Sequence, residues 1–290
     1  MSVVQKDKAL DQPVPVPTGT GTRIMWYAIT DKGLVRPQNE DAHVVDAVAA
    51  KDDTLRHLLA VADGVGGHHG GATASRMALR AIISEFLFWR GGSPERLVSR
   101  AVRNANDAVF DGSHAQSELS HMQTTLTAVV LEYDTLAVGH VGDCRLYRAR
   151  RGHTELLTRD HTVASELLNL RLITEEQALE HPGRHQLTRS LGSEPFLQVD
   201  VVKEKIQVGD SYLLCSDGLW SQTTPYDIED MLQNKVPDRA CKELVNLALR
   251  RGAPDNITAI VFRVTGVGGR PPSRSFWRKI LPQGKNLKSK

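Results

Sequence analysis

Short runs of β-branched and apolar residues recur between residues 124 and 264, and they limit the fold more than any other feature of the sequence. Turn signals such as Glu132-Tyr133-Asp134 and Val208-Gly209-Asp210 separate neighbouring runs. Gaps this short predict antiparallel hairpins, because a parallel connection needs a crossover of roughly a dozen residues or more. The runs are 124–131, 136–141, 144–149, 199–206, 211–215 and 257–264.

Two pairs of helices are expected around these strands. The first pair is indicated by apolar residues that recur every four positions from Ala74 to Phe86, and by Ser93-Pro94-Glu95, which supplies an N-cap, a first-turn proline and a first-turn acid. The second pair is expected near 226–233 and 238–251. With earlier strands near 27–30 and 58–62, this order predicts an α+β fold: a central β-sandwich of two antiparallel sheets flanked by helix pairs.

The chain is expected to divide into three parts. Residues 1–22, which contain three alternating prolines, are expected to form a disordered N-terminal lead. Residues 23–265 form one domain, in which the polar, partly helical segment 161–190 interrupts the strands. Residues 266–290 form a flexible tail with seven Lys or Arg and no acid. Because the whole chain carries +2, the remainder carries −5, and an acidic body disfavours binding to nucleic acid.

The sequence shows no signal for export or membrane insertion. No apolar run approaches the roughly 18 residues of a membrane span, and the N-terminus lacks the apolar core of a signal peptide. The three cysteines lie far apart, so they indicate neither a disulfide framework nor a thiolate zinc site. A cytoplasmic protein is therefore predicted. Segment 275–281 mixes aromatic and basic residues, and a solubilising role is favoured there over contact with an anionic membrane.

Acidic residues stand at the ends of several apolar runs. Asp63 follows the run 58–62, and Asp143, Asp217 and Asp255 adjoin later runs. Carboxylates from strand ends can converge on one rim of a fold, where they cannot all stay ionised without a cation. The sequence therefore predicts a site for Mg²⁺ or Mn²⁺, which prefer carboxylate oxygen, and a hydrolase. Taken singly, each aspartate is also compatible with an ordinary turn.

Three further features are candidates for the same site. Gly64 begins a glycine-rich turn in which backbone can approach a ligand closely and a carbonyl can bind a cation. Arg36 is suited to a phosphoryl group, although an ion pair with Glu40 or Asp41 is the simpler interpretation. His68, in the glycine-rich turn, is a candidate acid or substrate contact.

Eight short motifs occur in order along the chain: Arg36-Pro-Gln-Asn-Glu-Asp41, Ala62-Asp-Gly-Val-Gly-Gly-His68, Thr124-Thr-Leu126, Val141-Gly-Asp-Cys-Arg-Leu-Tyr147, Leu157-Thr-Arg-Asp-His161, Leu187-Thr-Arg-Ser-Leu-Gly192, Cys215-Ser-Asp-Gly-Leu219 and Pro254-Asp-Asn-Ile-Thr258. This series resembles the PP2C (PPM) family of metal-dependent Ser/Thr protein phosphatases, in its bacterial form. The resemblance covers roughly residues 24–264 and depends on the whole set, since each motif alone is weak.

The resemblance implies a centre of two Mn²⁺ or Mg²⁺ ions at one end of the sandwich. Asp63 matches the residue that bridges the ions, and the Gly64 carbonyl matches a ligand of the second ion. Asp217 and Asp255 match the carboxylates of the first ion. Glu40 matches the acid that supports the second ion through water.

The resemblance assigns three more parts of the chain. Asp143 together with Asp217 matches the site of an additional, third ion in bacterial members. Arg36 matches the arginine that binds phosphate. Segment 161–190 matches the mobile flap that influences substrate access.

The resemblance also implies a reaction course. A hydroxide that bridges the two ions attacks phosphorus in line, without a phosphoenzyme, while Arg36 and the ions offset charge on the phosphoryl oxygens. Eukaryotic members have a histidine directly after Asp-Gly as the general acid, whereas this chain has Val65. His68 is the hypothesis for that acid here, and a metal-bound water is the competing proton donor.

The implied substrates are proteins phosphorylated on serine or threonine, and the implied partner is a bacterial Hanks-type Ser/Thr kinase that the phosphatase opposes. One setting, suggested by analogy alone, is a secretion-system switch that controls a forkhead-associated protein. The alternatives are a catalytically inactive module that binds phosphoproteins, a partner-switching PP2C-type phosphatase, and a metal-dependent nuclease. Asp63, Asp217 and Asp255 argue against the inactive module, and the acidic body argues against the nuclease.

Overall fold

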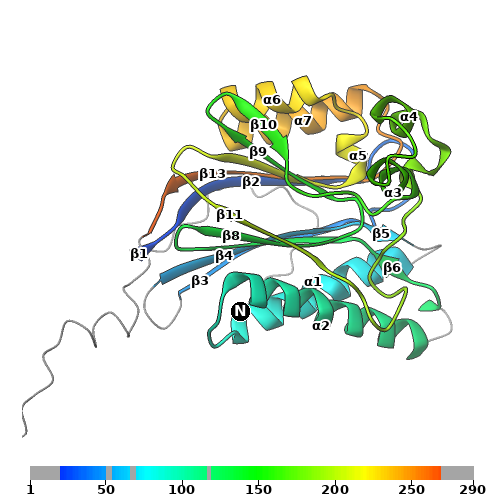
Figure 1. Cartoon of the computed structure of the whole chain (residues 1–290), viewed down its shortest axis with the longest axis horizontal. Helices are drawn as coiled ribbons and strands as arrows, with labels where there is room; N and C mark the ends of the chain where they lie inside the picture. The colour runs from blue at the N-terminus through cyan, green and yellow to red at the C-terminus, as the bar shows by residue number, and fades with distance from the viewer. Residues whose placement is uncertain (1–19, 50–53, 66–69, 116–118, 269–290) are drawn as a thin grey trace, which may run out of the picture.

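The computed structural model describes residues 20–49, 54–65, 70–115 and 119–268, and its elements form four layers (Figure 1). Two β-sheets lie face to face, and a pair of helices covers the outer face of each sheet. This arrangement confirms the predicted α+β sandwich. The predicted lead and tail lie almost entirely outside the described residues and stay predictions.

The first sheet has six strands in the order β1-β4-β7-β8-β11, with β3 paired to β4. Its pairs are antiparallel, as predicted, except that the two-residue β1 runs parallel to the start of β4. All seven residues of β7 are buried, because helices cover one face of the sheet and the second sheet covers the other. The strands are β1 (Thr20–Gly21), β3 (Ala42–Ala49), β4 (Thr54–Ala62), β7 (Leu126–Glu132), β8 (Thr135–Val141) and β11 (Asp200–Lys205).

The second sheet is antiparallel throughout, in the order β10-β9-β12-β13-β2. A further short pair, β5 with β6, lies at one end of the sandwich. These strands are β2 (Arg23–Asp31), β5 (Gly64–Val65), β6 (Gln123–Thr124), β9 (Arg145–Arg150), β10 (His153–Leu156), β12 (Ser211–Cys215) and β13 (Ile257–Gly266).

Three apolar clusters hold the four layers together. One joins the first sheet to α1 (Gly70–Phe88) and α2 (Pro94–Ala115), one fills the space between the sheets, and one joins the second sheet to α6 (Pro225–Asn234) and α7 (Pro237–Arg250). The stripe predicted for the first helix is buried as expected, at Ala74, Ala78, Ile82 and Phe86. Burial of these stripes is the main stabilising term of the layers.

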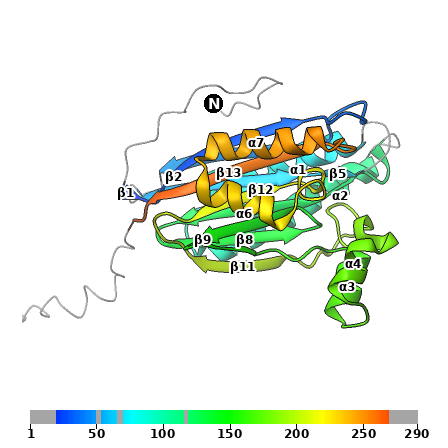
Figure 2. The same ribbon diagram turned by 90° about the horizontal axis from the view of Figure 1, so that it is seen from above.

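The segment predicted as a flap connects β10 to β11 and projects from one end of the sandwich (Figure 2). It contains α3 (Val163–Asn169), α4 (Glu175–Glu180) and the 3-10 turn η2 (Pro182–His185). At its base, His161 donates its backbone N–H to the Gly142 carbonyl at 2.8 Å and accepts from Thr188 N–H at 2.9 Å. The base of the flap is therefore tied to the turn that carries Asp143.

Candidate metal centre

Acidic residues from five separate stretches of chain meet at the end of the sandwich that carries the flap. Asp63 directly follows β4, Asp143 lies in the turn after β8, and Asp217 begins the short helix α5 (Asp217–Trp220). A single cavity of about 1400 Å³ contains seven of the eight residues predicted for the site: Arg36, Glu40, Asp63, Gly64, Asp143, Asp217 and Asp255. The eighth, His68, lies outside the described residues.

The carboxylates repel one another and are poorly solvated. Burial raises the pKa of Asp63 well above its usual range, and the negative charges of Asp41 and Asp217 raise it further. Burial, with the charge of Asp217, likewise raises the pKa of Asp143. The Oδ1 atom of Asp217 is buried and has no hydrogen-bond partner in the described part of the chain. Buried carboxylate oxygens that repel one another and lack hydrogen-bond partners fit the ligand set of a divalent cation.

His185 joins this cluster from the flap, and sequence reasoning did not identify it. One ligand atom each from Asp143, Asp217 and His185 lies within 4.8 Å of the others. His185 Nδ1 lies 3.4 Å from Asp217 Oδ2, and its ring stacks on Trp220 with centroids 5.9 Å apart. The only signal in the sequence was its place among the three histidines of the predicted flap.

Gly64 is required by close packing. A Cβ atom at this position would lie 2.3 Å from the Gly71 carbonyl oxygen and 2.7 Å from the Glu40 carbonyl oxygen, both backbone atoms. Next to it, the Asp63 backbone N–H donates to the Thr125 hydroxyl at 3.0 Å, and the Asp63 carbonyl accepts from Thr125 N–H at 2.8 Å. The chain between β4 and β5 is therefore held closely against its neighbours.

Arg36 donates to Asp255 Oδ2 at 2.6 Å, and half of its side chain is exposed. The simpler interpretation of this arginine named Glu40 or Asp41 as its ion-pair partner, whereas the structure has Asp255. The hydrogen bond to Asp255 raises the pKa of Arg36, so the guanidinium stays charged at the edge of the cavity. An arginine in this position has N–H groups left for an anion.

Two buried polar residues, Asn256 and Asp41, orient the acidic loops. Asn256 accepts from Glu40 N–H at 2.9 Å and donates to the carbonyls of Lys32 and Gln38 at 2.9 and 3.0 Å. Asp41 accepts from the Ser216 hydroxyl at 2.7 Å. Both residues were visible in the motifs beside Asp255 and Glu40, but Asn256 had been given no role and Asp41 had been named only as a candidate ion-pair partner of Arg36.

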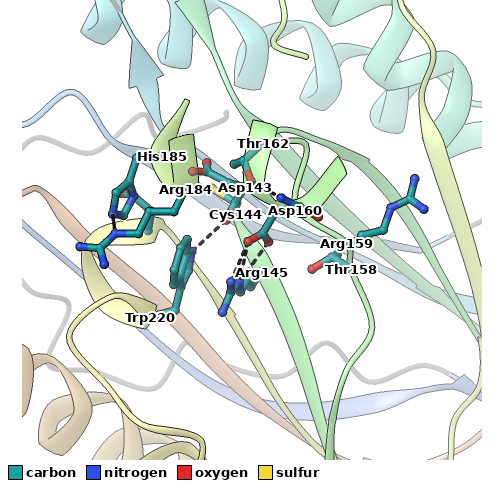
Figure 3. Close-up of polar contacts among 12 residues, drawn as sticks. Asp143, Cys144, Arg145, Thr158, Arg159, Asp160, Thr162, Arg184, His185 and Trp220 are labelled. Atoms are coloured by element: carbon teal, nitrogen blue, oxygen red, sulfur yellow. Dashed lines mark hydrogen bonds and ion pairs between the residues drawn. The ribbon is translucent and has the colours of Figure 1, made fainter. Parts of the chain in front are cut away.

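Trp220 joins the acidic cluster to the second sheet (Figure 3). Its indole N–H donates to the Asp143 carbonyl at 2.9 Å, and the Arg145 guanidinium lies over its ring at 3.6 Å from the centroid. Arg145 in turn forms a two-pronged ion pair with Asp160, with its shortest N···O distance at 2.7 Å. This network fixes the turn that carries Asp143.

Comparison with known proteins places this site in a family. The model of the protein phosphatase 2C family matches residues 27–257. The chain belongs to this family. It is 35% identical over 241 residues to the Ser/Thr protein phosphatase PstP of Mycobacterium tuberculosis, which covers 83% of this chain but 45% of PstP, so the chain spans about half the length of that relative.

Other family members match along nearly their whole length. The Ser/Thr phosphatase Stp of Listeria monocytogenes is 31% identical over 243 residues, covering 80% of this chain and 92% of Stp. The crystal structure of the catalytic domain of PstP with two manganese ions superposes with a TM-score of 0.74 at 33% identity, covering 84% of this chain and 99% of that domain.

Among the described residues, no helix is long and apolar enough to cross a membrane.

Proposed function

We propose that this protein is a metal-dependent phosphatase that hydrolyses phosphoserine and phosphothreonine in proteins. The observation that carries the proposal is the meeting of five acidic residues and Arg36 in one cavity of a protein phosphatase 2C fold. Residues 23–265 are the proposed catalytic domain, with 161–190 as its flap. The proposed substrates imply a Ser/Thr kinase that produces them, while the forkhead-associated protein and the cytoplasmic location stay predictions.

The oxygen donors support a site for two Mn²⁺ or Mg²⁺ ions. We assign the ions to the carboxylates of Asp63, Asp217 and Asp255, with the Gly64 carbonyl, and with Glu40 acting through water. The fit is supported by the raised pKa of Asp63 and the unpartnered Oδ1 of Asp217, both of which a cation would correct. The two manganese ions named for the PstP catalytic domain support the same assignment.

A third ion is proposed at Asp143 and Asp217. His185 is close enough to add a nitrogen ligand from the flap. A nitrogen ligand favours Mn²⁺ over Mg²⁺, since Mg²⁺ binds almost only oxygen. The proposed site therefore links metal binding to the position of the flap.

The proposed reaction breaks the bond between phosphorus and the serine or threonine oxygen as a water oxygen bonds to phosphorus. When bound, the divalent ions lower the pKa of water and offset the charge of the phosphoryl group. Arg36 contributes N–H donors at the cavity edge, and Asp255 holds its guanidinium in place. The leaving alkoxide takes up a proton, and the role of His68 in that step stays a prediction.

The test is hydrolysis of a phosphothreonine peptide and an aryl phosphate in EDTA, Mg²⁺ or Mn²⁺. We expect turnover only with metal, and a loss of at least about 100-fold in Asp217→Ala, because a metal ligand is removed. Asp230→Ala is the matched control, since this residue lies on α6, outside the cavity, and accepts a hydrogen bond from Asn234 at 2.7 Å. A folded, metal-loaded protein without turnover on either substrate would instead indicate the inactive phosphoprotein-binding module.

A further inference from the structure

The cavity that contains the acidic cluster extends well beyond it, toward the flap. Its volume of about 1400 Å³ exceeds the roughly 300–1,000 Å³ of an ordinary ligand pocket. A phosphorylated side chain with its ions fills only the acidic end. If the phosphoryl group lies there, as in the proposed function on which this inference rests, the remaining space is open to the polypeptide on one side of it.

The remaining space has apolar walls on two sides. The flap contributes Leu168 of α3 and Leu179 of α4, and the body contributes Leu156 of β10 and Trp220 of α5. Leu179 is 70% exposed and Leu156 is 40% exposed. Leucines left this open beside a catalytic cavity gain from burial under a ligand's apolar group.

Charged residues also lie near these walls, and two of them form an ion pair with each other. Arg145 and Asp160 form their own ion pair, and Arg184 donates to the Leu179 carbonyl at 2.9 Å and to His185 at 3.0 Å. Glu175 is the remaining charged residue of α4 at the wall. Because acidic Glu175 and cationic Arg184 both line this space, the charge of its walls is mixed, and the preference is assigned to the apolar groups.

We propose that this apolar part of the cavity binds a bulky apolar side chain flanking the phosphorylated residue. The preferred substrates are then phosphoserine or phosphothreonine segments with leucine, isoleucine or an aromatic residue within a few positions. The space is continuous with the acidic cluster, and an extended chain advances only about 3.3 Å per residue, so the contact is local.

The test compares phosphothreonine peptides that differ only in leucine or alanine at one position between three residues before and three after the phosphothreonine. We expect kcat/KM to be about tenfold higher for leucine at the best position, as for other apolar subsites. The ratio of the two values within one protein is the readout, so differences in overall activity cancel.

Two variants and a control locate the preference. Leu179→Ala and Leu156→Ala should each reduce the leucine-to-alanine ratio to about threefold or less, since each removes part of one wall. Leu172→Ala should retain the full ratio, because Leu172 is a flap leucine of similar exposure, 66%, that does not line the cavity. Equal kcat/KM for both peptides, or a ratio lost in Leu172→Ala as well, would overturn the proposal.

The outcome can be separated from failure of the proposed function. Hydrolysis of an aryl phosphate, which has no flanking residues, reports the chemistry alone. Binding of hydrolysis-resistant phosphonate versions of the two peptides reports contact with the apolar part of the cavity without the reaction. We expect about tenfold tighter binding of the leucine peptide. Equal binding of the two peptides contradicts the proposed apolar subsite, even if the protein hydrolyses the aryl phosphate. Tighter binding of the leucine peptide supports the subsite, even if the protein shows no turnover.

Discussion

At the scale of single residues, Trp220 has a defined function that its position after Asp217 did not reveal. It donates its indole N–H to the carbonyl of Asp143, and it is stacked between Arg145 and His185. The backbone of Asp143 is therefore held by a side chain from a different element. Trp220 is a positioning residue for the proposed third ion.

Replacing Trp220 with phenylalanine should weaken the proposed third ion selectively. The ring stays, but one hydrogen bond to Asp143 is lost, which is worth about 1 kcal/mol, or about fivefold in Mn²⁺ affinity. The measurement is a Mn²⁺ titration followed by electron paramagnetic resonance. Trp89→Phe is the matched control, because the Trp89 indole N–H has no partner within the described residues and Arg100 also lies over its ring. Equal losses in both variants would contradict the positioning role.

The aspartates of the site could be predicted from the sequence, while the residues that orient them could not. Asp63 and Asp217 adjoin apolar runs, and that pattern is local. Asn256 acts through carbonyls more than 200 positions away, and His185 reaches Asp217 from the flap. Such contacts depend on tertiary packing, which a single sequence without its fold does not specify.

At the scale of elements, two helices with the same capping box differ in what they bury. α4 begins with Thr174 and Gln177 in a capping box but has no buried residue. α6 begins with Thr224 and Asp227 in the same arrangement and buries Ile228 and Leu232 against the second sheet. We therefore expect α4 to unfold locally, whereas α6 is expected to unfold only together with the whole domain.

Thr174→Ala should loosen the flap without destabilising the domain. Loss of an N-cap costs about 1 kcal/mol, so hydrogen exchange in residues 175–180 should become about fivefold faster. The melting temperature should stay nearly constant. Thr224→Ala, the matched change in α6, should lower the melting temperature by about 2–4 °C. A clear drop in melting temperature for Thr174→Ala would show that α4 unfolds together with the rest of the domain.

Long elements were predicted from periodicity, and short or atypical ones were missed. The stripe from Ala74 to Phe86 predicted α1, and the runs at 211–215 and 257–264 predicted β12 and β13. β10 was missed because four residues carry too little pattern, and its side chains are only partly buried. β3 was missed because its sequence does not alternate between apolar and polar residues, and residues 42–48 are all partly buried.

At the scale of the whole molecule, buried ionisable groups give opposing effects on stability as pH changes. Burial raises the pKa of Asp41 to about 7, so ionisation of this group opposes folding at pH 7 and above, and that penalty is lost as the pH falls from about 7 toward 4. Burial lowers the pKa of His140 to about 4 and that of His161 to about 3. These histidines have the opposite effect: they lower the folding stability as the pH falls. Below about pH 6.5 the unfolded chain takes up protons on these rings that the folded protein does not. Only matched variants can separate the two contributions.

His140 offers the clearest measurement, because its ring lies behind the site and both nitrogens have partners. Nε2 donates to the Arg159 carbonyl at 3.0 Å, and Nδ1 lies 2.8 Å from the Thr127 hydroxyl, which is also within 3.1 Å of the Cys144 carbonyl. Burial lowers the pKa of this ring to about 4, which favours its neutral form at pH 7.5. His140→Gln should be less stable than the wild type at pH 7.5. The gap in the free energy of unfolding between the wild type and this variant should narrow by about 1 kcal/mol at pH 5.5. The reason is that only the wild type loses stability through this histidine as the pH falls toward 4.

The gap is measured by chemical unfolding in EDTA, so that metal binding does not contribute. Val138→Ala, a buried position two residues earlier on β8 without a titratable group, should show a gap that does not change with pH. A constant gap for His140→Gln would mean that the folded protein also accepts the proton on this ring, through rearrangement around Thr127 and Arg159. A narrowing gap would show that the neutral His140 ring contributes to the loss of folding stability as the pH falls.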